Sequence, residues 1–343
     1  MTPKKSYKRA FIIIFMVLVL CFVANISLGS VLIPWLDTIN SLWGGAVEKE
    51  SWRHIIISYR LPKACTAIIV GSGLGVSGLL MQTLFRNPLA GPYVLGISSG
   101  ASLGIAVLIL GSTFASATTA ALLVSNWGLV GAASLGSILV LIAVTVVSVK
   151  VRDTMAILII GLMFGSITAA IVSVLSYFAP AEQLQRYIFW GFGSLGNLSW
   201  IDLLIFMGIS LLGMILAVIS IKPLNTLLLG ENYARSLGLN IKVSRFLVIT
   251  ATGLLAGSII AFSGPIAFIG LAVPHVTRQL FHTSDHKTLI PAVILLGSII
   301  MLICDTIAQV PGIEYTLPIN AITSLIGAPV VIWLLVRKRK MLF

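Results

Sequence analysis

The chain has 343 residues, of which 58% are hydrophobic and only 9% are charged, and its mean hydropathy is +1.09. Ordinary soluble domains carry roughly 25% charged residues, so the composition excludes a soluble fold and predicts an all-α polytopic membrane protein surrounded by the lipid bilayer. The net charge of +12 could suggest nucleic acid, but no basic stripe with interleaved aromatic residues occurs. Nucleic acid is therefore excluded as a partner.

Ten apolar runs approach or exceed the length of about 20 residues that crosses a bilayer. We predict ten transmembrane helices, at 11–33, 58–84, 93–111, 125–149, 154–178, 200–221, 246–262, 265–281, 288–308 and 318–336. The first run is longer than the apolar core of a signal peptide, so we expect it to be retained. The loop between Pro180 and Trp200 is predicted to be partly helical.

The basic residues divide unequally between the two sides of these ten segments. With both termini inside, all but five of the 22 basic residues lie on the inner side; the five are Lys49, Arg53, Arg60, Lys63 and Arg186. This asymmetry follows the positive-inside rule. We therefore expect a multi-pass protein of the cell membrane with cytoplasmic N- and C-termini.

The stretch from Lys222 to Arg245 is polar and too short in its apolar pieces to cross a bilayer. Its apolar residues recur at helical spacing, which predicts two short surface helices on the cytoplasmic face. Glu231 falls in the first turn of the second helix and Arg235 in a later turn, as the helix dipole prefers, and Gly238 lies at a C-terminal cap position. A solvated connecting loop is the alternative that composition leaves open.

Two glycine patterns bear on nucleotide chemistry. The run 73–78 matches the dinucleotide fingerprint G-x-G-x-x-G, but that motif needs a preceding strand. Inside an apolar helix, small residues at this spacing instead allow close helix packing. The phosphate-binding G-x-x-x-x-G-K-[ST] motif is absent, so the chain is predicted not to be an enzyme, and any ATP hydrolysis belongs to a separate subunit.

The isolated histidines and acidic residues do not indicate a catalytic or metal-binding function. His275 could be catalytic, but without a nucleophile motif a structural role is the better interpretation. His282, Asp285 and His286 could bind a metal, but a solvated cytoplasmic turn is favoured, and we predict neither a metal nor a cofactor. Asp305 near the end of 288–308 is the exception in segments otherwise poor in carboxylates, which disfavours a proton-coupled secondary transporter.

Arg60 and Lys63 form a pair of positive charges at the outer end of the second segment. Exposed charges there could anchor the helix to lipid headgroups. They could equally attract acidic residues of a docking protein. The residues alone favour the lipid anchor.

Several motifs after residue 55 resemble the FecCD-type permease subunits of ABC importers for iron–siderophore complexes, haem and vitamin B12. They are YRLPK at 59–63, SGLLMQ at 77–82, RNPLAGP at 86–92, LGISSGA at 95–101, GENYARSLG at 230–238, GPIAFIGLAVPH at 264–275 and IGAP at 326–329. The resemblance implies one transmembrane permease domain over 1–343 with the type II ABC importer fold. It also implies a second permease subunit, identical or not, two ATPase subunits, and a substrate-binding protein on the extracellular or periplasmic side.

The same resemblance implies roles for particular residues. It places the helices that couple to the ATPase subunits within 222–240, with the matching positions at Glu231, Arg235, Ser236, Leu237 and Gly238. It also implies that Arg60 and Lys63 meet acidic residues of the binding protein, which reverses the preference for a lipid anchor. The implied mechanism is ATP-driven alternating access.

The sequence departs from the family at two positions near the outer side. Gln309 stands where the family commonly has an arginine, and Asn320 stands where a glycine is usual.

We expect a ferric-siderophore permease, because siderophores are the commonest cargo of the family. Haem and cobalamin are the alternative cargoes. Two other classes of membrane protein are alternatives: a secondary transporter, and a scaffold or binding protein that transports nothing.

Overall fold

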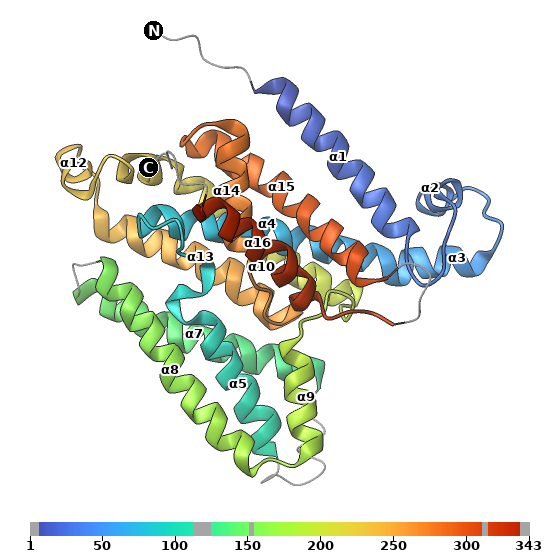
Figure 1. The fold of residues 1–343 in the computed structure, drawn as a ribbon, viewed down its shortest axis with the longest axis horizontal. Helices are drawn as coiled ribbons and strands as arrows, with labels where there is room; N and C mark the ends of the chain where they lie inside the picture. The colour runs from blue at the N-terminus through green and yellow to red at the C-terminus, as the bar shows by residue number, and fades with distance from the viewer. Residues whose placement is uncertain (1–6, 113–124, 151–153, 311–314, 337–343) are drawn as a thin grey trace. The chain divides into compact units, whose positions relative to one another are not determined.

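The computed structural model describes residues 7–112, 125–150, 154–310 and 315–336. Within these ranges the regular elements are all helices (Figure 1). The charged turn at 151–153, the lysines before residue 7 and the basic tail after residue 336 lie outside the described residues. The chain divides into two compact units, unit 1 being Met1–Val76, Leu195–Ile205 and Ala267–Phe343, and unit 2 being Ser77–Ser194 and Phe206–Ile266.

The helices of unit 1 are α1 (Lys8–Ser27), α2 (Trp35–Trp43), α3 (Glu50–Ile55), α14 (Ile269–Phe281), α15 (His286–Ala308) and α16 (Ile319–Val336). Those of unit 2 are α5 (Ile97–Gly111), α7 (Asn126–Lys150), α8 (Thr154–Phe178), α9 (Ala181–Gly191), α11 (Ile221–Leu227), α12 (Glu231–Ser236) and α13 (Ile241–Ser263). Two long helices, α4 (Leu61–Leu84) and α10 (Trp200–Ile219), contribute residues to both units.

Each of the ten predicted segments coincides with a helix, which confirms the all-α membrane fold. Among the described residues, seven helices are long and apolar enough to cross a membrane, and α5 and α16 are shorter apolar helices. The predicted segment at 265–281 is shorter than expected, because the chain stays extended after Gly264 and α14 begins only at Ile269. The partly helical loop at 180–200 is confirmed as α9.

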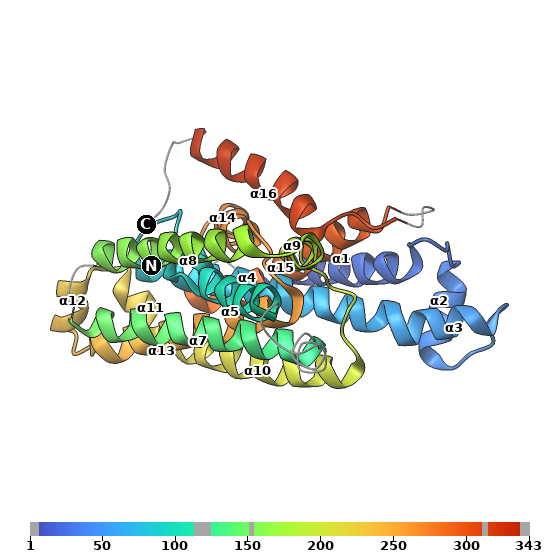
Figure 2. The ribbon, with the colours of Figure 1, turned by 90° about the horizontal axis from the view of Figure 1, so that it is seen from below.

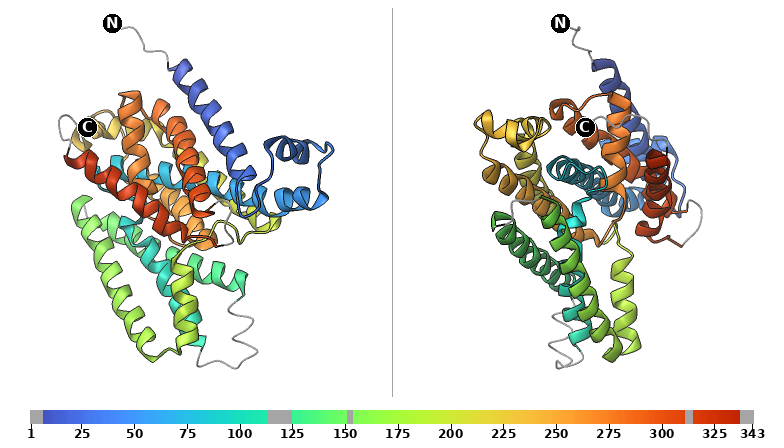
Figure 3. Two further views of the ribbon diagram at one scale, coloured as in Figure 1. Left: turned by 45° about the vertical axis from the view of Figure 1, so that its right-hand side comes forward. Right: turned by 60° about the vertical axis from the view of Figure 1, so that its left-hand side comes forward.

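In unit 1, α15 packs against α1 and α14 (Figure 3), and it meets α4 at Gly71. The rings of Tyr7 and Phe11 pack against Phe281 in a tilted arrangement, with ring centroids 5.5 and 5.1 Å apart. A Cβ on Gly71 of α4 would overlap the backbone carbonyl of Gly297 in α15, so only glycine allows the two helices to approach this closely. This contact confirms the packing interpretation of the glycine-rich stretch in α4.

Unit 2 is a bundle in which α5 packs against both α7 and α8 (Figures 1 and 2). Gly100 of α5 and Gly136 of α7 meet backbone to backbone, and α13 packs on the other side of α7. Phe206 stacks on Phe262 at 5.2 Å between ring centroids. The two short helices α11 and α12 lie between α10 and α13 along the chain, as the sequence predicts.

Candidate coupling and docking sites

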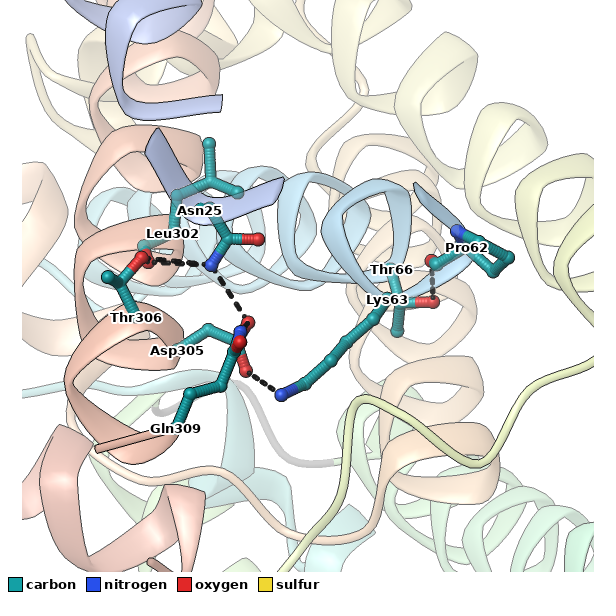
Figure 4. Close-up of polar contacts among 8 residues, drawn as sticks. All are labelled: Asn25, Pro62, Lys63, Thr66, Leu302, Asp305, Thr306 and Gln309. Atoms are coloured by element: carbon teal, nitrogen blue, oxygen red, sulfur yellow. Dashed lines mark hydrogen bonds and ion pairs between the residues drawn. The ribbon is translucent and has the colours of Figure 1, made fainter. Parts of the chain in front are cut away.

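A buried polar cluster joins three helices of unit 1 (Figure 4). Asp305, in the last turns of α15, has a side chain only 2% exposed. Its Oδ1 pairs with the Lys63 ammonium at 3.1 Å. Its Oδ2 accepts hydrogen bonds from the side-chain amides of Asn25 at 2.9 Å and Gln309 at 2.8 Å. Both carboxylate oxygens are therefore engaged, as a buried charge requires.

Asn25 is a member of this cluster that sequence reasoning missed. Its amide also reaches the Thr306 hydroxyl at 2.9 Å and the Leu302 carbonyl at 3.3 Å, so it ties the last turns of α1 to α15. The available signal was a lone amide in an otherwise apolar segment, which needs a partner when buried. Gln309, noted as a departure from the family, donates to Asp305 where an arginine would bring a second positive charge.

Arg60 is also internal, and the expectation that it presents an exposed charge is wrong. The residue is 8% exposed. Its guanidinium donates to the backbone carbonyls of Ile26 at 2.8 Å and Ser27 at 2.9 Å, and to that of Val31. The last carbonyls of a helix have no partner within it, so Arg60 satisfies the end of α1.

The backbone before α4 explains how Arg60 reaches α1. Residues Ile56–Arg60 form a π-helical turn, so that α3, this turn and α4 make one continuous helical rod from Glu50 to Leu84. Such insertions often lie at functional positions because they redirect a side chain. Lys63, one turn further on, retains 21% exposure of its side chain. It is the more accessible of the two predicted docking residues.

The coupling segment, residues 222–240, lies in unit 2. Leu224, Leu227 and Ala234 are buried and anchor α11 and α12 to the unit. Arg235, Ser236, Leu237 and Gly238 are all exposed. Tyr233 and Leu237 are 55% and 59% exposed, so α12 presents apolar as well as charged groups to its surroundings. An exposed face of this kind suits insertion into the groove of a partner.

The ends of α12 follow the predicted caps. Glu231 lies in the first turn and Arg235 in the last. The amide N–H of Gly238, which has a φ of +83°, donates to the Arg235 carbonyl at 2.9 Å. The Glu231 carboxylate forms an ion pair with Arg245 of α13 at 2.5 Å. Among the residues implied for coupling, Glu231 therefore holds α12 in place, while the exposed ones are free to meet a partner.

One further expectation, about the turn before α15, is changed by the structure. His286 is 1% exposed at the first turn of α15, so the prediction of a solvated turn is wrong for this residue. Asp285 caps the same helix by accepting from the Lys287 amide at 3.0 Å. Within the described residues, no group of three histidine, cysteine or acidic side chains is placed to hold a metal ion.

Asn320, the second departure from the family, has a visible structural role. Its side-chain Oδ1 accepts the amide N–H of Ala267 at 3.0 Å. Ala267 belongs to the extended stretch just before α14, where helical hydrogen bonds are missing. The asparagine therefore satisfies a backbone group that a glycine could not reach.

An all-helical chain with several helices long and apolar enough to cross a membrane, and a polar segment of two short helices, belongs to the class of polytopic membrane proteins. The model of the FecCD transport family matches residues 17–337, and the chain belongs to this family. It is 35% identical to the hemin transport system permease HmuU of Yersinia pestis over 304 residues, 88% of this chain and 89% of that protein. It is 37% identical to the vitamin B12 import system permease BtuC of Klebsiella pneumoniae over 282 residues, 82% of each chain.

Solved structures agree with this assignment. A proposed metal-chelate type ABC transporter in an inward-facing conformation has a TM-score of 0.84 and 30% sequence identity, covering 97% of this chain and 100% of that one. PsaBC from Streptococcus pneumoniae, at 18% identity and a TM-score of 0.55, shares the fold alone. The chain is thus a membrane-embedded permease of the ABC importer type.

Proposed function

We propose that the chain is the permease subunit of an importer that carries a ferric siderophore across the cell membrane. The observation that carries the proposal is the likeness, over 97% of the chain, to a transporter described as metal-chelate type. A ferric siderophore is a metal chelate. Haem and cobalamin are the second candidates, favoured by the relatives at 35% and 37% identity that are named for hemin and vitamin B12.

Uptake of labelled cargo tests this proposal. Cells lacking the gene would receive radiolabelled iron as hydroxamate, catecholate or carboxylate complexes, with labelled haem and cobalamin in parallel. We expect loss of uptake for one siderophore class, restored by the intact gene. Loss of haem or cobalamin uptake alone would overturn the siderophore assignment. Uptake that persists without ATP, but needs a proton gradient, would indicate a secondary transporter.

The mechanism proposed is alternating access driven by ATPase subunits. Both termini and the coupling segment would face the cytoplasm, where two ATPase subunits dock, and a second permease subunit would complete the pathway. The exposed face of α12, with Tyr233, Arg235 and Leu237, would sit in a cleft of the ATPase. Closure of the ATPases on ATP would then move α11 and α12 and rock the helices of the pathway.

Charge reversal at Arg235 tests the coupling role. We expect Arg235→Glu to abolish uptake while leaving membrane insertion and folding intact, because the side chain is exposed and lies in no core. Lys242→Glu is the matched control, since Lys242 is an exposed lysine of α13 outside the coupling segment. Normal transport by Arg235→Glu would show that α12 does not receive the ATPase.

At the other end of α4, we propose that Lys63 supplies the charge that meets a carboxylate of the binding protein. Arg60 shapes the same site by holding the end of α1. Lys63→Gln removes the charge but keeps a donor for Asp305, and we expect weaker binding of the cognate binding protein with a smaller salt dependence. Lys49→Gln, at an exposed lysine before α3, is the control. Unchanged affinity in Lys63→Gln would show that Lys63 serves its ion pair with Asp305 and does not bind the partner.

A further inference from the structure

Arg86 is the first basic residue after α4, and no role described above uses it. Its Nη2 donates to the backbone carbonyl of Leu227 at 2.7 Å. Leu227 is the last residue of α11, and its carbonyl accepts the Gly230 amide at 3.1 Å as well as the guanidinium. The two residues are 141 positions apart, and both lie in unit 2.

The backbone at Arg86 is held in an unusual conformation. Its φ is +48°, a region that residues with a Cβ rarely adopt. The turn is closed by the amide of Asn87, which donates to the Gln82 carbonyl at 3.2 Å, and the preceding residues Met81 to Phe85 are all buried. Arg86 therefore projects from a firmly packed helix end.

A second cation holds the other half of the coupling segment. Arg245 of α13 pairs with Glu231 at the start of α12 at 2.5 Å. The end of α11 and the start of α12 are thus each held by an arginine, one from the end of α4 and one from α13. Between them runs the short connection 228–230, where Gly230 has a φ of +112° and its Cα faces the Arg86 guanidinium.

We propose that Arg86 is a positioning residue of the transport cycle, which transmits the movement of α11 to the C-terminal end of α4. This inference rests on the proposed coupling function of α11 and α12. An ATPase that displaces the coupling segment pulls on the Leu227 carbonyl, and the charge-assisted hydrogen bond carries that displacement into α4. The C-terminal part of α4, from Ser77 to Leu84, belongs to unit 2 together with α11, so the displacement passes between two elements of one unit.

The test uses the complete importer in liposomes, with both permease subunits, the ATPases and the binding protein. Arg86→Ala removes the hydrogen bond, and Arg86→Lys keeps a charged donor that can reach a carbonyl. We measure co-purification of the ATPase subunits, ATP hydrolysis without binding protein, and cargo transported per ATP. Lys242→Ala is the control that removes an exposed charge elsewhere in unit 2.

For Arg86→Ala we expect the ATPases to stay bound and to hydrolyse ATP, while transport per ATP falls about tenfold or more, as loss of a charge-assisted hydrogen bond allows. Arg86→Lys should recover much of the loss, and Lys242→Ala should transport normally. Arg86→Gln removes the charge and shortens the side chain, and it leaves Gly230, with its φ of +112°, unchanged. It should also lower transport per ATP, which keeps the proposal testable if Arg86→Ala does not fold.

Two outcomes overturn the proposal. Unchanged transport per ATP in both Arg86→Ala and Arg86→Gln would show that the contact transmits nothing. Loss of the ATPase subunits from the Arg86→Ala complex would show that Arg86 is a docking residue instead. If the wild-type permease itself fails to bind ATPase subunits, the proposed function fails, and this result is distinct from either of the others.

Discussion

The ion pair between Lys63 and Asp305 makes a prediction about stability that depends on which partner is removed. At 3.1 Å, with an effective dielectric constant of about 20, two unit charges attract by about 5 kcal/mol. Desolvation offsets much of this attraction, but removing one partner of a buried pair typically costs about 3–5 kcal/mol. Lys63→Met leaves the carboxylate, which is 2% exposed, with only its two amide donors. We expect a cost of about 3 kcal/mol, near the lower end of that range.

Asp305→Asn should cost less. The Lys63 side chain is 21% exposed, so its ammonium can turn toward water when the carboxylate is gone. The new amide oxygen still accepts from Asn25 or Gln309, and we expect a loss of about 1–2 kcal/mol. In the Lys63→Met background, Asp305→Asn should stabilise the protein instead of destabilising it, because the substitution then removes an unpaired buried charge. The double variant should be about 1–2 kcal/mol more stable than Lys63→Met alone.

Thermal unfolding in detergent, followed by tryptophan fluorescence, measures these differences. A change of 1 kcal/mol shifts Tm by about 2–4 °C in domains of 150–250 residues, so Lys63→Met should lower Tm by about 6–12 °C. Asp305→Asn should raise Tm in the Lys63→Met background. Additive losses in the double variant would show that the two charges do not interact in the folded protein, and would refute the reasoning.

Two further predictions concern contacts within unit 1. Gly71→Ala should destabilise the protein by about 1–3 kcal/mol, because its Cβ would overlap the Gly297 carbonyl. Gly208→Ala in α10 is the control and should be neutral or slightly stabilising, because a Cβ there meets open space. Equal Tm values for the two variants would contradict the close packing of α4 on α15. Arg60→Lys should lower Tm despite keeping the charge, since one ammonium cannot reproduce the guanidinium fork that serves three carbonyls, and an unchanged Tm would mean that those bonds contribute nothing.

The membrane fold could be predicted from the sequence because hydropathy is a local property. A run of apolar residues fixes the place of a helix whatever its neighbours do, and all ten predicted segments are helical. The caps of α12 were equally local, since Glu231, Arg235 and Gly238 act within a turn of their own positions. The start of α14 was misjudged because extended and helical residues are equally apolar before Ile269.

The candidate sites could be predicted only in part. The resemblance predicted a coupling role for 222–240 and a docking role for Arg60 and Lys63, and both roles remain predictions. It missed Asn25 and Arg86, whose importance depends on partners 280 and 141 residues away. It also expected Arg60 to be exposed, because a charge beside an apolar segment usually lies in the headgroup region.

Hydropathy along the sequence was enough to predict a helical membrane protein with ten apolar segments, because the cost of placing charged or apolar groups in water or lipid is set residue by residue. The permease function was predicted from the resemblance of its motifs to a family. The partner of each charge became known from the folded structure alone. Lys63 pairs with Asp305, Glu231 with Arg245, and Arg86 with the end of α11. A buried charge must be paired wherever packing places it, and packing depends on helices that are distant in the sequence.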